Sequence, residues 1–381
     1  MRRNPWAAIR RKRVEVAFGI LLVVAAFFTF TFTGSPKMAS LGGTGGKSAA
    51  FHRFLSPNGD AFFGKPSGRY CDGRVIIDFI AEKLKLPYLS AYLDSIGSKF
   101  RHGANFATGG STIQALDTKI FESGFSPISL DKQILQFEQF KARTLELQNE
   151  DGGSSYIQSS LPRPEDFGKA LYTLDIGQND LHFGFSLVTE EQVLETLPNI
   201  LNQFAQAAEK LYQLGARVFW VHNTVPIGYL PYSVIHYPPK PDNVDQNGYV
   251  KSHNEVAKEF NRQLKEKIFE FRMQLPHAVI TYVDIYSAKY SLISEAKKHG
   301  FVNPLGYCCG HSGVQYGKNA KVNGTLLFGS SCSNSSLYIN WDGVHYSQAA
   351  NRWVATQILN GSLSDPLVLV SELCDKQVRR L

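Results

Sequence analysis

Near its carboxyl end the chain places an aspartate and a histidine three residues apart, in the stretch INWDGVHYS (Ile339–Ser347). A Ser/His/Asp hydrolase needs a serine oxygen as nucleophile, an imidazole that takes its proton, and a carboxylate that fixes the imidazole tautomer. Asp342 and His345 have the residue types for the last two roles. Each also has an ordinary structural explanation, as a helix cap and as a surface histidine. The pair therefore predicts acid/base chemistry only if other residues supply a nucleophile and hydrogen-bond donors.

Apolar strand patterns alternate with amphipathic helix patterns along most of the chain, after a loop-like region at residues 34–70. We predict strands at Ala170–Asp180, Ala216–Val225 and Ala278–Tyr286, and a short one entering the glycine-rich turn of GANFATGG (Gly103–Gly110). We predict helices at Asp72–Leu86, with Asp72 as the cap, and at Thr189–Leu214, Val250–Leu275 and Ser347–Leu359. This alternation is typical of a mostly parallel sheet with helices on both faces, which is a three-layer α/β/α domain.

Three polar segments fall where such a sheet holds its chemistry. LDIGQND ends a predicted strand, GANFATGG forms a turn, and WDGVHYS precedes a helix. Because the carboxyl ends of parallel strands meet at one edge of the sheet, we expect these segments to converge there. An asparagine or a glycine after a strand is also a common turn residue, so neither type identifies a site by itself.

The amino-terminal region has the composition of a targeting segment. Six of the seven net positive charges lie before Glu15, so the rest of the chain is nearly neutral, and no nucleic-acid-binding motif is present. Residues 16–33 then run without a charge. We interpret them as a signal anchor that places the body of the protein in the secretory lumen, behind a basic cytosolic tail at residues 1–15. The alternatives are a cleaved signal peptide, with small residues around 38–40, and a buried hairpin or strand.

Sequons and cysteines agree with a luminal body. Asn323, Asn334 and Asn360 begin Asn-X-Ser/Thr tripeptides and are candidate glycosylation sites. Three of the five cysteines, Cys308, Cys309 and Cys332, lie close together and predict at least one disulfide bond. The alternative is a zinc site that includes His311, although adjacent cysteines lack the usual spacer between zinc ligands. We therefore expect no metal.

In this order and at these separations, the motifs GANFATGGST, LDIGQND, WVHNTVPIGYLP and WDGVHYS resemble those of the plant GDSL-type esterase/lipases, which are members of the SGNH hydrolase superfamily with a flavodoxin-like fold. The resemblance covers about residues 44–375, behind a linker at 34–43 and before a tail at 376–381, and includes SPNGDAFFGKPSGRYCDGRVIIDFIAE. It departs from the family at Val225 and Tyr229, where a glycine and a cysteine are common.

The resemblance implies hydrolysis of a small-molecule ester, such as a lipid, an acetylated sugar or a secondary metabolite, with no cofactor. It makes His345 the general base and Asp342 its orienting partner. It also makes the Asn179 side-chain amide and the Gly110 backbone amide the two donors that stabilise the oxyanion.

The nucleophile block of the family is degenerate here. Counting back from Thr44-Gly45-Gly46 places Ser40 at the position of the catalytic serine, but Met38 and Ala39 stand where glycine and aspartate belong. The preceding residues 33–37 contain a glycine and a proline where a central strand is expected, and residues 26–33 are an alternative first strand. Three readings stay open: an esterase that uses Ser40, a catalytically impaired or ligand-binding relative, and a gene model whose true first exon carries the nucleophile block.

Overall fold

The computed structural model describes residues 37–42, 55–94, 96–116, 124–150, 155–310, 314, 316–322 and 324–373. The predicted basic tail and the predicted anchor at 16–33 lie outside these residues, as does the alternative first strand at 26–33. Within the described ranges, no helix is both long enough and apolar enough to cross a membrane.

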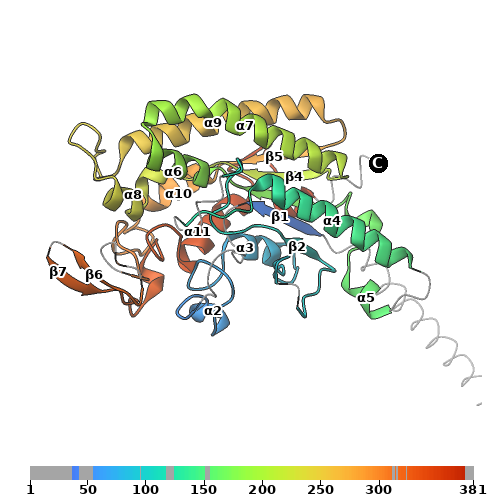
Figure 1. The fold of residues 1–381 in the computed structure, drawn as a ribbon, viewed down its shortest axis with the longest axis horizontal. Helices are drawn as coiled ribbons and strands as arrows, with labels where there is room; N and C mark the ends of the chain where they lie inside the picture. The colour runs from blue at the N-terminus through green and yellow to red at the C-terminus, as the bar shows by residue number, and fades with distance from the viewer. Residues whose placement is uncertain are drawn as a thin grey trace, which may run out of the picture. The chain divides into compact units, whose positions relative to one another are not determined.

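A six-stranded sheet, in the order β2-β1-β3-β4-β5-β8, forms the centre of the fold (Figure 1). The first five strands in this order are parallel, and β8 pairs antiparallel at one edge. The strands are β1 (Met38–Gly42), β2 (Gly103–Asn105), β3 (Leu171–Asp175), β4 (Val218–His222), β5 (Val279–Val283) and β8 (Ser364–Asp365). The predicted mostly parallel sheet is confirmed.

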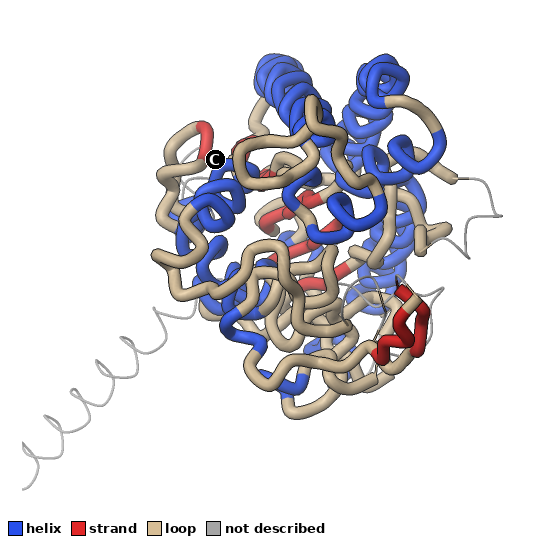
Figure 2. The backbone as a smooth tube through the Cα atoms, turned by 90° about the vertical axis from the view of Figure 1, so that its left-hand side faces the viewer, coloured by secondary structure: helices blue, strands red, loops and turns tan. Residues whose placement is uncertain are grey.

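Helices cover both faces of this sheet. On one face lie α4 (Leu130–Asn149), α7 (Glu190–Gln213) and α9 (Lys251–Gln274), and on the other α3 (Ile76–Lys83), α10 (Ile285–Ser294) and α11 (Gln348–Leu359). The shorter helices are α2 (Asp60–Phe63), α5 (Ser155–Ser160), α6 (Gln178–Leu187) and α8 (Pro231–His236), and β6 (Asn319–Val322) pairs with β7 (Thr325–Phe328) in a separate hairpin. Figure 2 shows the sheet from the side of α6 and α8, where loops lie in front of the strands.

Alternation of side chains along the strands gives the sheet two different faces. Phe219 and Val221 of β4 lie against Ile268 of α9 in a small apolar cavity, and Tyr172 of β3 packs edge-on against Phe137 of α4. Thr173 and Asp175 alternate with these residues in β3, and both line a larger cavity together with Ile76 of α3. One face is therefore an apolar core, whereas the other becomes polar toward the carboxyl ends of the strands.

The first strand departs from the sequence analysis. Residues 34–43 were expected to be a linker, but Met38–Gly42 forms β1, which pairs with β2 on one side and β3 on the other. The strand begins after Pro36, so proline occupies no ladder position, and the side chains of Met38, Ala39 and Leu41 are buried. The prediction failed because it sought the strand at residues 33–37, a few residues too early.

The other predicted strands and helices are observed, with bounds that differ by up to five residues, but the capping role of Asp72 differs. Helix α3 begins at Ile76 and not at Asp72. The Asp72 carboxylate instead accepts hydrogen bonds from the backbone N–H of Gln348, at the first turn of α11, and from the Ser335 hydroxyl. It therefore satisfies the start of a helix that lies far away in the sequence.

Candidate active site

A cavity opens at the carboxyl ends of β3 and β4. Polar residues from several segments line it: Tyr70, Asp175, Gln178, Asn179, His222, Lys289 and His345. Its apolar wall includes Ile76, Ile77 and Ile80 of α3 and the segment Val225, Ile227 and Leu230 after β4. Val225, one of the two departures from the family pattern, thus belongs to the cavity wall.

Asp342 forms a close pair with His345, which lines this cavity. The Nδ1 atom of His345 lies 2.7 Å from Oδ2 of Asp342, while Oδ1 accepts the backbone N–H groups of Val344 and His345. Burial alone raises the pKa of Asp342, but the neighbouring imidazole and these hydrogen bonds outweigh it and hold the pKa below 3.8. The ionised carboxylate accepts a hydrogen bond from the Nδ1–H group, which leaves Nε2 of His345 as the basic nitrogen.

Three contacts hold the loop that carries this pair. Cys308 and Cys332 form a disulfide bond, and the backbone N–H of Cys308 donates to the carbonyl oxygen of Trp341. The indole N–H of Trp341 donates to Asn58 Oδ1 over 2.9 Å. The predicted disulfide bond is confirmed, and it removes Cys308 as a zinc ligand. His311 lies outside the described residues, and within them no three His, Cys, Asp or Glu side chains cluster to hold a metal ion.

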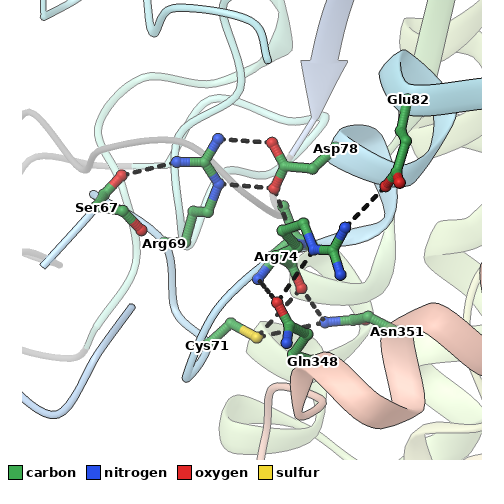
Figure 3. A network of polar contacts seen from close by, with 9 residues as sticks. Ser67, Arg69, Cys71, Arg74, Asp78, Glu82, Gln348 and Asn351 are labelled. Carbon is green, nitrogen blue, oxygen red and sulfur yellow. Dashed lines mark hydrogen bonds and ion pairs between the residues drawn. The ribbon is translucent and has the colours of Figure 1, made fainter. Parts of the chain in front are cut away.

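Tyr70 covers one face of the imidazole, because its ring stacks on that of His345. Figure 3 shows the polar network around the loop that carries Tyr70. Arg69 forms a bidentate ion pair with the buried Asp78 of α3, with nitrogen to oxygen distances of 2.6 and 2.7 Å. The backbone N–H of Arg74 donates to the Gln348 side chain, which joins the loop to α11. This network fixes the loop between the two helices beside the cavity.

Asn179 and the turn that contains Gly110 are tied together. The Asn179 side-chain amide donates to the carbonyl oxygen of Ser111 over 2.8 Å, and an amide group has a second hydrogen to donate. The Asp180 carboxylate accepts the backbone N–H groups of Ile113 and Gln114. Burial raises the pKa of Asp180 to about 7, although these bonds act in the opposite direction. Sequence analysis missed Asp180, although its place in GxND next to Asn179 was the available signal.

Gly110 has a backbone conformation that only glycine adopts easily. Its φ is +79°, and a Cβ atom at this position would lie 2.5 Å from the carbonyl oxygen of Gly124. The turn therefore requires glycine both for its dihedral angles and for the close approach of residues 124–126. The structure brings Asn179 and His345 to one cavity and places Gly110 directly before Ser111, the residue that Asn179 contacts.

Ser40 lies inside β1 rather than in a turn. It pairs with Asn105 of β2 and Thr173 of β3, and the strand continues to Gly42, which pairs with Asp175. The contacts of the Ser40 side chain lie outside what the structure describes. Its partner Thr173 lines the cavity that also contains His345.

A second group of titratable side chains at this cavity was not predicted. Oδ2 of Asp175, at the end of β3, lies 3.3 Å from Nδ1 of His222, at the end of β4. The buried Lys289 of α10 faces the same cavity. The positions of Asp175 and His222 at strand ends were visible in the sequence, but the lysine lies within a helix pattern without any motif.

Two candidate glycosylation sites can be placed. Asn334 and Asn360 are exposed, and the hydroxyls of Ser336 and Ser362 donate to their respective side-chain oxygens. Asn323 lies outside the described residues. Both visible sequons are accessible, and their glycosylation stays a prediction.

Several known proteins are similar to this chain over most of its length. The model of the GDSL-like lipase/acylhydrolase family matches residues 40–358. A GDSL esterase/lipase of Arabidopsis thaliana is 52% identical over 339 residues, which cover 88% of this chain and 87% of the relative. An esterase of Hevea brasiliensis is 47% identical over 87% of this chain and 86% of its own. A protein of Arabidopsis thaliana named alpha-L-fucosidase 3 is 46% identical over 88% of this chain and 89% of its own.

Proposed function

The chain belongs to the GDSL-like lipase/acylhydrolase family, and we propose that it hydrolyses carboxylic esters at the cavity beside His345. The observation that carries this proposal is the Asp342–His345 pair, in which His345 lines one cavity with Asn179. A base held by an ionised carboxylate, next to an amide donor, has the parts needed for acyl transfer.

In the proposed mechanism, Ser40 is the nucleophile. Its hydroxyl oxygen bonds to the ester carbonyl carbon while Nε2 of His345 takes the proton, and the Asn179 amide and the Gly110 N–H stabilise the oxyanion. The alkoxide leaves with the proton from His345, and water then cleaves the acyl-enzyme with the same base. The pairing of Ser40 with Thr173, a residue of the cavity wall, supports this assignment.

A second candidate function is ligand binding with little or no ester turnover. The specific observation in its favour is the strand position of Ser40, two residues before the end of β1 and flanked by β2 and β3. A nucleophile must come within hydrogen-bond reach of its base, and a strand residue between two neighbours has little freedom to move.

We also propose that the protein enters the secretory pathway, attached to the membrane through residues 16–33 or released after cleavage. The disulfide bond, which forms in oxidising compartments, and the exposed Asn334 and Asn360 support a luminal location. Alkaline carbonate extraction of the expressed full chain tests the anchor, because an anchored protein stays in the membrane pellet. Release into the supernatant would contradict it.

The test of activity compares the full chain with the variants Ser40→Ala and His345→Ala on short-chain nitrophenyl esters, after expression in a secretory host. We expect both substitutions to remove at least 99% of turnover, roughly the scale seen when catalytic triad members are lost. The exposed His277 supplies the control variant His277→Ala, which should match the wild type.

Other outcomes distinguish the candidates. Loss of activity in His345→Ala but not in Ser40→Ala would exclude Ser40 as the nucleophile. An inactive wild type with a folded circular dichroism spectrum would favour the ligand-binding relative. The panel includes a nitrophenyl fucoside because one relative is named as a fucosidase, and selective turnover of this glycoside would overturn the esterase proposal.

A further inference from the structure

The inner part of the cavity contains buried polar side chains without hydrogen-bond partners. Within the described chain, the hydroxyls of Thr173 and Tyr346 and both amide atoms of Gln178 are buried and unpaired. All three residues line the cavity, and Thr173 and Tyr346 are 3% and 5% exposed. Buried polar groups are normally hydrogen-bonded, so several such atoms on one cavity wall indicate that a polar ligand supplies their partners.

Lys289 adds a charged donor to the same wall. Its side chain is 7% exposed, and its ammonium group lies 4.3 Å from the centre of the Tyr346 ring. Among the described residues it has no ion pair within 4 Å and no hydrogen bond, and its opposite charge is the more distant Asp175. A buried ammonium without a hydrogen-bond acceptor is costly, which makes this group a strong donor to any ligand oxygen that reaches it.

The charges on this wall select a neutral ligand over an anion. Asp175 already balances Lys289. Nδ1 of His222 lies 3.3 Å from Oδ2 of Asp175 but makes no hydrogen bond among the described residues, while its Nε2 accepts the indole N–H of Trp220 over 3.1 Å. A carboxylate or phosphate at this place would meet the negative charge of Asp175. A hydroxyl group can accept from Lys289 and donate to Asp175, and a polyol can do so while it also bonds Thr173 and Gln178.

We propose that Thr173, Asp175, Gln178, Lys289 and Tyr346 form a subsite for a neutral polyhydroxylated group, such as an unmodified sugar ring, in the substrate. This inference rests on the proposed function insofar as it names one part of the ester. The apolar wall of Ile76, Ile77 and Ile80 offers a separate surface for an aliphatic acyl group. The substrate class is therefore an acylated polyol with free hydroxyl groups.

Binding can be tested without turnover in the full-length His345→Ala variant. Saturation-transfer NMR and calorimetry with methyl glucoside, inositol and glucuronate should show binding of the two neutral polyols and weaker binding of the anionic sugar. Lys289→Met and Thr173→Val, each introduced into this background, should weaken polyol binding about tenfold or more, as expected for lost hydrogen bonds to buried groups.

Thr281→Val supplies a matched control. Thr173 of β3 and Thr281 of β5 both pair with Trp220 of β4, which lies between them in the sheet. The Thr281 hydroxyl is likewise buried and unpaired among the described residues. It does not belong to the residues described as lining the cavity, so polyol binding should be unchanged. Equal losses in Thr173→Val and Thr281→Val would show a general effect on the sheet and overturn the subsite.

Kinetics on an active enzyme give a second measurement. The ratio of kcat/KM for 6-O-acetylglucose to that for ethyl acetate should fall about tenfold in Lys289→Met and stay constant in Thr281→Val. Polyol binding by a protein without esterase activity would support the subsite while it refutes the proposed function. Preference for glucuronate, or esterase activity with neither polyol binding nor a changed ratio, would refute the subsite while the proposed function stands.

Discussion

The ring of Tyr70 lies nearly parallel to that of His345, with centroids 4.6 Å apart and 13° between the planes. Tyr70 comes from the loop before α3, whereas His345 precedes α11, so two distant parts of the sequence form this stack. The contact limits rotation of the imidazole about the hydrogen bond that Nδ1 makes with Asp342. Tyr70 is thus a positioning residue for the proposed base.

Replacing Tyr70 should lower turnover without abolishing it. An aromatic pair contributes about 0.5–1.5 kcal/mol, so Tyr70→Ala should reduce kcat roughly two- to tenfold, while Tyr70→Phe keeps the stacked ring. Steady-state kinetics with a nitrophenyl ester measure the effect, and Tyr316→Ala, at an exposed tyrosine, is the control. Equal loss in Tyr70→Phe and Tyr70→Ala would show that the hydroxyl, and not the stack, is responsible.

The glycine requirement at position 110 can be separated from simple backbone strain. Gly110 and Gly124 both have positive φ, at +79° and +90°, but only Gly110 has atoms within 4 Å of an added Cβ. Gly124→Ala should cost about 1 kcal/mol of stability, which is the usual penalty of this conformation. Gly110→Ala should cost clearly more and also reduce turnover. Chemical denaturation and kinetics of the two variants test this, and equal stability losses would contradict the close contact.

The ion pair of Arg69 and Asp78 should be important for stability because Asp78 is almost completely buried. Its side chain is 1% exposed and that of Arg69 is 13% exposed. Removing one partner of a buried pair leaves an unpaired charge, so Arg69→Met should lower the free energy of unfolding by about 3 kcal/mol. The double variant Arg69→Met/Asp78→Leu should recover part of the loss.

The surface pair of Arg262 with Glu259 provides the comparison for this measurement. It has similar nitrogen to oxygen distances, but its side chains are 55% and 33% exposed, so Arg262→Met should leave the urea midpoint nearly unchanged. A midpoint shift for Arg69→Met no larger than that for Arg262→Met would show that burial of Asp78 does not determine the stability of this loop.

Much of the fold was predictable because its signals are local. The predicted helix Val250–Leu275 is observed at Lys251–Gln274, and the predicted strand Ala278–Tyr286 contains Val279–Val283. Asp342 and His345 were also predictable as a pair, because their separation of three residues lets one turn bring them together.

The remaining features depend on contacts between distant residues. The strand Met38–Gly42 has only five residues, ends in a glycine and is followed by Gly43, so its pairing with β2 and β3, rather than its own pattern, makes it a strand. The role of Asp72 at the start of α11 and the burial of Lys289 in α10 likewise arise from packing. Tertiary contacts of this kind override local sequence preference.

The disulfide bond between Cys308 and Cys332 should stabilise the loop before Asp342. It closes a loop with a sequence separation of 24 residues, for which chain entropy predicts about 3 kcal/mol of stabilisation. Cys308→Ser/Cys332→Ser should therefore lower Tm and also reduce turnover, because the backbone of Cys308 contacts Trp341. Calorimetry with and without a reductant tests this. A reductant should shift the wild type toward the variant and leave the variant unchanged, and an unshifted wild type would contradict the prediction.

The buried Lys289 should make stability increase with pH in alkaline solution. Burial lowers its pKa from 10.5 to about 8, with Asp175 acting in the opposite direction. Between these values the unfolded chain binds more protons than the folded protein, so the free energy of unfolding rises as pH increases from about 8 to 10.5. The full gain approaches about 3 kcal/mol, and Lys289→Met lacks it while being more stable than the wild type at pH 7.

Urea denaturation of both proteins across this range measures the difference, in which the contributions of other titrating groups cancel. Lys258→Met, at an exposed lysine of α9, should run parallel to the wild type at every pH, and a parallel curve for Lys289→Met would refute the burial of its charge.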